Sequence, residues 1–212
     1  MFNKVSLLIA AAIIVPNAAL AAHSWRDFKD VSNTSFVEPN GDRSLQLSID
    51  VPASPKAVFD AFTTREGFSS WAVPVADIDL RIGGMIEASY NSHAKIGDPD
   101  NIKNQIVAYV PDRLLIIHNV QAPKGFVDSE LFQKTVTIIE FAATGPDTTH
   151  VTLTNAGYGK GAGFDDVYSH FEWGDAYTLH ELRARFVNGP VDWAALEAKA
   201  KAAAAAKKVE GK

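Results

Sequence analysis

The chain contains no cysteine among its 212 residues. It therefore forms no disulfide, offers no thiol nucleophile and supplies no thiolate to a metal. It also lacks the acylated cysteine through which a lipoprotein is anchored. Stability has to come from packing alone, and an apolar content of 47% is sufficient for a globular core.

Basic residues are outnumbered, with 20 Lys and Arg against 25 Asp and Glu and a formal net charge of −5. No stripe combines basic with aromatic side chains, as a nucleic-acid surface requires. The Lys-rich stretch from Lys199 to Lys208 alternates with alanine and is typical of a helix or a frayed tail. The composition therefore argues against a nucleic-acid partner.

A single long apolar run, from Val5 to Val15, lies at the N-terminus. Lys4 precedes the run, and Ala19-Leu20-Ala21 follows it as a small-x-small cleavage site. The run is shorter than the ~20 residues of a membrane span. The pattern predicts a signal peptide over residues 1–21, a periplasmic or secreted protein, and no permanent membrane anchor. Cleavage of the signal peptide removes the positive charge of Lys4, so the formal net charge changes from −5 to −6.

Metal and phosphate motifs are missing as well. The six histidines have no paired ligand spacing, and His180-Glu181 lacks the second histidine of a zinc-binding helix. The glycine-rich stretch from Gly157 to Gly163 has neither a Walker pattern nor a βαβ context. We therefore expect no metal and no cofactor.

The most informative segment present is an alternating strand that leads directly into a helix. Apolar residues alternate with polar ones from Ser44 to Val51, which is the pattern of a strand with one buried face. Ser54 is suited to cap a helix that begins at Pro55, where the missing proline N–H costs nothing. Val58, Phe59 and Phe62 then form the apolar stripe of that helix.

Downstream, the period changes to strands and then to a long helix. The pattern predicts a short helix over residues 65–71 and strands over 75–82, 85–90, 102–110, 113–120, 135–143 and 150–155. Apolar residues at helical spacing then run from about Phe164 to Asn188, with one interruption near Asp175, and stop at Gly189-Pro190. These patterns divide the chain into four expected regions: the signal peptide 1–21, a loosely packed leader 22–42, a domain 43–190, and an Ala/Lys-rich tail 191–212.

Five stretches between Arg43 and Asn188 together form a recognisable series: Pro55–Thr63, Trp71, Asp79–Gly84, Tyr109–Leu114 and Val151–Gly159. In their order and spacing the chain resembles the START/Bet v 1-like (SRPBCC) superfamily, in the branch related to the Hsp90 ATPase activator (AHSA1) C-terminal domain. This resemblance implies an α+β helix-grip fold. That fold has a curved antiparallel sheet of about six to seven strands, two short helices, and one long C-terminal helix packed across the sheet.

In helix-grip proteins the space between the long helix and the sheet is commonly a cavity. Strand alternation places Leu114, Ile116 and His118 on one face, which we expect to point into that space. The expected ligand-binding residues are Trp71, Tyr90, Tyr109, Ile116, His118, Phe132, Phe141, Tyr168 and Phe171. The same aromatic residues are equally typical of an ordinary core, and the sequence leaves both interpretations open.

Three functions remain. The first is an exported protein that holds a small hydrophobic or aromatic ligand in the cavity. The second is a cyclase/aromatase- or hydrolase-like enzyme that uses His118 with Tyr90 or Tyr109 as acid and base. The third is a protein-interaction module related to Hsp90 activators, although the sequence identifies no protein partner.

Overall fold

The computed structural model describes residues 23–123 and 125–210, so the predicted signal peptide lies outside the described residues. In chain order the elements are the 3₁₀ helix η2 (Trp25–Asp27), strands β1 (Ser32–Asn33), β2 (Phe36–Val37) and β3 (Arg43–Val51), helices α2 (Pro55–Thr63) and α3 (Arg65–Ser69), strands β4 (Val75–Ile78), β5 (Met85–Ser89), β6 (Ile102–Val110) and β7 (Leu114–Gln121), helix α4 (Ser129–Phe132), strands β8 (Val136–Gly145) and β9 (Thr148–Tyr158), and helices α5 (Ala162–Asn188) and α6 (Trp193–Glu210).

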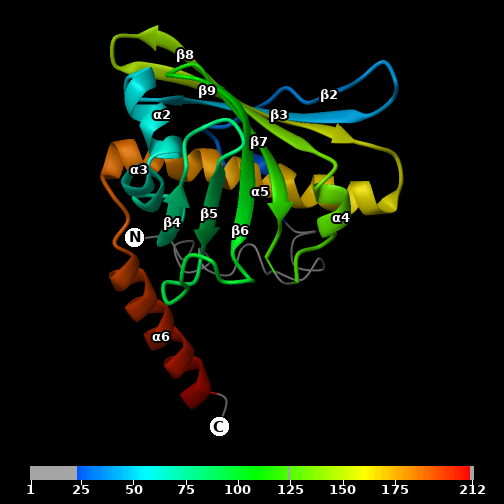
Figure 1. The fold of residues 1–212 in the computed structure, drawn as a ribbon. Helices are drawn as coiled ribbons and strands as arrows, with labels where there is room; N and C mark the ends of the chain where they lie inside the picture. The colour runs from blue at the N-terminus through cyan, green and yellow to red at the C-terminus, as the bar shows by residue number, and fades with distance from the viewer. Residues whose placement is uncertain (1–22, 124, 211–212) are drawn as a thin grey trace.

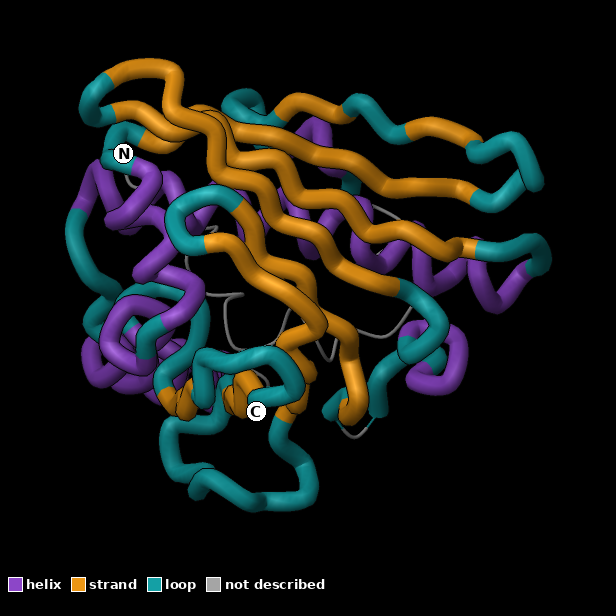
Figure 2. Tube along the Cα trace, turned by 45° about the horizontal axis from the view of Figure 1, so that its top comes forward, coloured by secondary structure: helices purple, strands orange, loops and turns teal. Residues whose placement is uncertain are grey.

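The strands form one antiparallel sheet that curves around helix α5 (Figures 1 and 2). Their order is β1-β3-β9-β8-β7-β6-β5-β4, and β2 also pairs with β3. The predicted α+β helix-grip architecture is confirmed. The predicted count of six to seven strands was wrong, because the described residues form nine. The two additional strands, β1 and β2, have only two residues each and therefore carry no alternating pattern.

The segment that precedes β3 belongs to the folded core, so our expectation of loose packing was wrong. Phe28 and Val31 are buried in the main hydrophobic cluster. Ser32 pairs with Ser48 of β3, and the Nδ1 atom of His180 on α5 lies 3.0 Å from a carboxylate oxygen of Asp30. The two buried apolar residues are too few to give this polar stretch a recognisable period.

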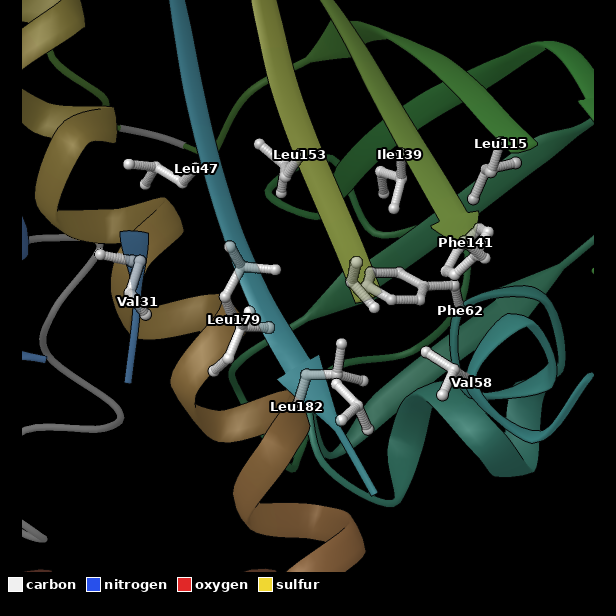
Figure 3. Packing of buried hydrophobic residues seen from close by; sticks show 14 of the residues in the cluster. Val31, Leu47, Val58, Phe62, Leu115, Ile139, Phe141, Leu153, Leu179 and Leu182 are labelled. Carbon is white, nitrogen blue, oxygen red and sulfur yellow. The ribbon is translucent and has the colours of Figure 1, made fainter. Parts of the chain in front are cut away.

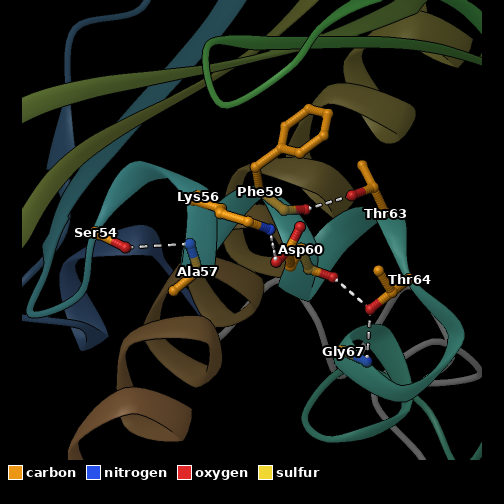
Figure 4. Close-up of polar contacts among 8 residues, drawn as sticks. All are labelled: Ser54, Lys56, Ala57, Phe59, Asp60, Thr63, Thr64 and Gly67. Carbon is orange, nitrogen blue, oxygen red and sulfur yellow. Dashed lines mark hydrogen bonds and ion pairs between the residues drawn. The ribbon is translucent and has the colours of Figure 1, made fainter.

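Helix α2 begins as the sequence predicts. The Ser54 hydroxyl accepts a hydrogen bond from the Ala57 N–H at 3.4 Å, and Pro55 occupies the first helical position. At the other end, the Thr64 hydroxyl donates to the Asp60 carbonyl and accepts from the Gly67 N–H, which starts α3 (Figure 4). These local bonds fix the angle at which the two short helices meet.

The core lies between the concave face of the sheet and the helices α2 and α5. Figure 3 shows Leu47, Leu153, Ile139 and Leu115, from four neighbouring strands, facing the side of the sheet on which Leu179 of α5 lies. Each of these five residues is no more than 3% exposed. Their burial supplies the main favourable free energy of folding, and it holds α5 over the sheet.

Helix α5 ends at the predicted stop signal, where Gly189 adopts a φ of 92° and its N–H donates to the Arg185 carbonyl. Helix α6 then leaves the body of the domain (Figure 1). Its first residue is held in place, because the Trp193 Nε1–H donates to the Ser69 carbonyl at 2.7 Å. In the part of the chain that the structure describes, no helix combines the length and hydrophobicity needed to cross a membrane.

Candidate ligand cavity

A cavity of about 220 Å³ lies between helix α5 and the concave face of the sheet. Side chains of α5, the strands β5 to β9, the region of α3, and the connection between β7 and β8 form its walls. Apolar and aromatic residues predominate in the lining: Phe62, Phe68, Trp71, Ala72, Val73, Ile86, Ala88, Tyr90, Ile102, Leu115, Ile117, Pro123, Phe126, Phe132, Ile139, Leu153, Phe171, Trp173 and Tyr177. Seven further residues supply polar side chains on the sheet and helix walls: Asn104, Asn119, Thr137, His170, Asp175, Thr178 and Glu181.

The structure brings four of the nine predicted site residues to this cavity. They are Trp71, Tyr90, Phe132 and Phe171. The Phe132 and Phe171 rings stack with their centroids 4.4 Å apart, and Phe126 packs against both. Phe126 and Phe132 therefore connect the β7–β8 segment to α5 and close one side of the cavity.

Three of the predicted residues lie elsewhere. Phe141 is buried against Phe59 and Phe62, and Tyr109 also packs on Phe59, so both belong to the core near α2. Tyr168 packs against the ring of Tyr158 near the beginning of α5. Alternation correctly placed Phe141 on the inner face, but the cavity extends along only part of that face.

Ile116 and His118 lie on the opposite face of β7, which corrects our assignment of this strand. Leu115, Ile117 and Asn119 are the β7 residues that line the cavity. The strand begins Leu-Leu-Ile-Ile, so both of its faces are apolar and alternation alone does not identify the inner one. The pairing of β7 with β8 identifies the inner face, because Leu115 lies opposite Ile139, which is 2% exposed.

His118 has a structural partner outside the cavity. Its Nε2 atom lies 2.6 Å from the Gln133 carbonyl oxygen, just after α4. A ring nitrogen that binds this carbonyl connects β7 to the segment that carries Phe132. The geometry therefore removes His118 as the acid or base of a reaction inside the cavity.

A buried polar chain joins the sheet to α5 at the cavity wall. The Thr137 hydroxyl donates to Oδ1 of Asn155 at 2.5 Å, and Nδ2 of Asn155 donates to Oδ2 of Asp175 at 2.6 Å. Asp175 is only 8% exposed. Burial raises the pKa of the Asp175 carboxyl well above its ordinary value, while the hydrogen bond from Asn155 offsets part of this effect.

Several polar atoms of the lining residues have no hydrogen-bond partner among the described residues. They are Oδ1 of Asn119, Nδ1 of His170 and the hydroxyl of Tyr177. Burial lowers the pKa of His170 and keeps its ring neutral. Burial also raises the pKa of the Tyr90 and Tyr177 hydroxyls, so both remain protonated. Buried polar atoms without partners are costly, and all three of these atoms belong to residues that line the cavity.

Sequence reasoning missed the polar residues of the cavity. The signal for Asp175 was present, because this acidic residue interrupts the apolar face of a long helix. Asn119 was missed because the wrong face of β7 was taken as the inner one. Over residues 23–123 and 125–210, no cluster of three or more His, Asp or Glu side chains is arranged to hold a metal ion.

Comparison with known proteins agrees with this architecture. A family model described as Activator of Hsp90 ATPase homolog 1-like protein matches residues 52–186. Solved structures with the same fold include the Aha1 dimer from Colwellia psychrerythraea, at 15% identity over 69% of this chain and 97% of that chain, with a TM-score of 0.52. No curated protein matches the chain.

Two further structures show the same fold. CalU16 from Micromonospora echinospora is 20% identical over 83% of this chain and 96% of its own, with a TM-score of 0.50. The protein MLL2253 from Mesorhizobium loti is 17% identical over 68% of this chain and 98% of its own, also with a TM-score of 0.50. At these identities the likeness concerns the fold alone.

Proposed function

The chain belongs to the Activator of Hsp90 ATPase homolog 1-like family, and we propose that it binds a small apolar or aromatic molecule in the cavity between its sheet and α5. The observation that carries this proposal is the combination of an apolar, largely aromatic wall with buried polar atoms that have no protein partner. Ligand sites characteristically combine such a wall with a few polar groups that orient the ligand.

The volume limits the size of the ligand. A dry cavity of ~150 Å³ holds one benzene molecule, and sites for drug-sized ligands begin near ~300 Å³. The present cavity, at about 220 Å³, lies between these values. It suits one aromatic ring with a short substituent better than a long lipid chain.

We further propose that the protein meets this ligand outside the cytoplasm. The support is the predicted signal peptide, with Lys4 before the apolar run and Ala19-Leu20-Ala21 after it. The interaction-module alternative is supported by family membership alone. Predicted export would separate the chain from a cytosolic, ATP-driven partner.

An enzymatic function would need an acid and a base that both reach the cavity. The pair proposed from the sequence does not meet this requirement, because His118 and Tyr109 lie outside it. A binding protein needs only the wall and the orienting polar groups. We therefore place ligand binding first.

The test is native mass spectrometry of the mature protein, combined with titration of phenethyl alcohol followed by tryptophan fluorescence. Trp71 and Trp173 line the cavity and should report its occupancy. We expect a copurified small molecule, or saturable binding of the probe that is lost in Gly174→Leu. A β-carbon at Gly174 would meet no atom within 4 Å, so the leucine side chain has room to occupy the cavity. The proposal is contradicted if the wild-type protein carries no copurified small molecule and does not bind phenethyl alcohol.

A further inference from the structure

Among the residues that the structure describes, the charged side chains of the cavity wall are acidic. Asp175 and Glu181 both project from α5, and neither lysine nor arginine is among the described lining residues. His170 is the remaining basic group of the lining, and burial lowers its pKa so that its ring is neutral. An anionic ligand would meet two carboxyls and, from residues 23–123 and 125–210, no lysine or arginine in the lining.

The amide of Asn119, a residue of the cavity lining, leaves one hydrogen-bond acceptor without a partner among the described residues. Its Nδ2 atom has three acceptors within reach: Asn104 Oδ1 at 3.0 Å, the Gln121 carbonyl at 3.2 Å and the Lys103 carbonyl at 3.3 Å. Three acceptors around one end of the amide fix its orientation, because a flipped amide would place oxygen against oxygen. Oδ1 is therefore the free end, on a side chain only 4% exposed that has no partner for this atom.

The carboxyls of α5 also have unused acceptor capacity. Within the described residues, Asp175 accepts one hydrogen bond, from Asn155 to Oδ2, and none reaches its other oxygen. No described side chain or backbone N–H donates to Glu181. The polar part of the wall therefore requires hydrogen-bond donors from the ligand.

Aromatic faces adjoin this acidic wall. Trp173 and Tyr177 lie on either side of Asp175 in the sequence of α5, and their rings stack with centroids 5.4 Å apart. Tyr90 and Trp71 contribute further rings to the same cavity. Aromatic rings next to carboxylates are the usual surroundings of a buried organic cation, since the ring faces carry negative electrostatic potential.

We propose that the ligand of this cavity is a primary organic ammonium ion with an aromatic or short apolar body, whose charged head lies against the Asp175 carboxyl on α5, while Glu181 adds a second acid to the same wall. This inference rests on the proposed function. The ammonium group supplies three donors and one positive charge, which match the free acceptors and the two acids. An alcohol of the same shape supplies one donor and no charge.

Proton release accompanies such binding. Burial raises the pKa of Asp175 and of Glu181, and an ammonium ion beside them lowers both again. The other titratable groups that interact electrostatically with these carboxyls or share their cavity are Tyr90, Tyr158, Tyr177, His170 and His180. The three tyrosines have raised pKa values and remain neutral. These tyrosines are therefore not the source of the released protons.

The test compares three probes with one aromatic body: phenethylamine, phenethyl alcohol and phenylacetate. Calorimetric titration is carried out in two buffers of different ionisation enthalpy, so that proton release is measured together with affinity. We expect phenethylamine to bind roughly tenfold or more tightly than the alcohol, with proton release, because a buried ion pair and cation–π contacts each favour the cation. Phenylacetate should bind more weakly than either.

Substitutions on α5 then test which carboxyl is responsible for the preference for the amine. Asp175→Asn and Glu181→Gln should each reduce the preference for the amine over the alcohol, whereas Glu172→Gln on the same helix should leave it unchanged, because Glu172 does not line the cavity. Circular dichroism confirms that each variant is folded. Should Asp175→Asn fail to fold, Glu181→Gln and the probe series on the wild-type protein still decide the question.

The outcomes separate the two proposals. Binding of the alcohol or of phenylacetate as tight as that of the amine overturns the ammonium inference and leaves the proposed binding function intact. Failure of all three probes to bind overturns both. A preference for the amine that survives in Asp175→Asn and Glu181→Gln overturns the assignment of the cation to these carboxyls.

Discussion

The side-chain amide of Asn155 on β9 donates to Oδ2 of Asp175 on α5 at 2.6 Å, and the two residues are 1% and 8% exposed. This bond joins strand β9 to the middle of the long helix. It also holds the acidic group of the cavity in one position. Its partner Thr137 fixes the Asn155 amide from the other side.

Replacing Asn155 by alanine should leave the Asp175 carboxyl buried without its donor. We expect the free energy of unfolding to fall by roughly 2–3 kcal/mol, the cost typical of an unsatisfied buried polar group. Urea unfolding followed by circular dichroism measures this change. The matched control is Asn33→Ala, whose amide lies 3.5 Å from Glu172 in a less buried setting. Equal losses in the two variants would contradict this role of Asn155.

The stability of the protein should depend on pH through Asp175. Its pKa is raised from 3.8 by burial, so between 3.8 and the folded value the native state holds a proton that the unfolded chain has released. Its contribution is therefore complete below 3.8 and is lost as pH rises through the folded pKa. Unfolding of the wild type and of Asp175→Asn at several pH values measures this effect, and the difference between them should shift in favour of the variant as pH increases.

The difference between the two proteins is the informative quantity, because His170 acts in the opposite direction. Its lowered pKa means that the unfolded chain binds the proton more readily, which favours the native state as pH rises toward 6.5. His170 is present in both proteins and cancels in the difference. If the difference in unfolding free energy between the wild type and Asp175→Asn stays constant as pH rises above 3.8, the pKa of Asp175 is not raised.

Gly174→Ala should stabilise the protein. The residue lies in the interior of α5, and an added β-carbon would meet no atom within 4 Å. Alanine in a helix interior is favoured over glycine by roughly 0.5–1 kcal/mol. Thermal unfolding tests the prediction. Gly163→Ala is the contrasting variant, since its β-carbon would lie 2.6 Å from the Leu131 side chain and should give a smaller gain or a loss.

His118→Ala should leave the affinity for phenethylamine and phenethyl alcohol unchanged within about twofold, because the ring lies outside the cavity. Loss of its contact with the Gln133 carbonyl should instead increase hydrogen exchange around α4. Exchange mass spectrometry and the calorimetric titration measure the two effects on one sample. Loss of affinity without a change in exchange would place His118 at the ligand after all.

Trp193→Ala should release helix α6 from the domain. The indole N–H of Trp193 bonds to the Ser69 carbonyl at 2.7 Å, and the neighbouring Val191 N–H bonds to Ser70 at 2.8 Å. We expect faster limited proteolysis near residue 193, with no change in cavity binding. Trp193→Phe keeps an aromatic ring at this position but removes the N–H donor, so it should have a smaller effect. Unchanged proteolysis in Trp193→Ala would contradict this anchoring.

The fold could be predicted from the sequence because the signals that start and end its elements are local. Ser54 and Pro55 start α2, Gly189 and Pro190 end α5, and the inner strand residues alternate. The two helix signals depend on only a few neighbouring residues. The two-residue strands β1 and β2 lack such signals, since pairing with β3 alone defines them.

The cavity was less predictable because its residues are selected by distant contacts. The Leu-Leu-Ile-Ile start of β7 is apolar on both faces, and only the register with β8 decides that Leu115 faces inward. Asp175 was visible as an interruption of an apolar stripe, but the sequence does not indicate that Asn155 lies opposite. Which aromatic residues border open space and which fill the core depends on the packing of the entire helix against the sheet.

The two ends of the sheet have a consequence for self-association. A long exposed strand edge is a template for pairing with another chain. Here β4 has four residues, while β1 and β2 cover parts of the nine-residue β3 at the opposite end. The short segment before β3 thus shields hydrogen-bonding backbone groups that would otherwise recruit a second molecule. Its loss would favour aggregation through strand pairing, even where the ligand cavity remained intact.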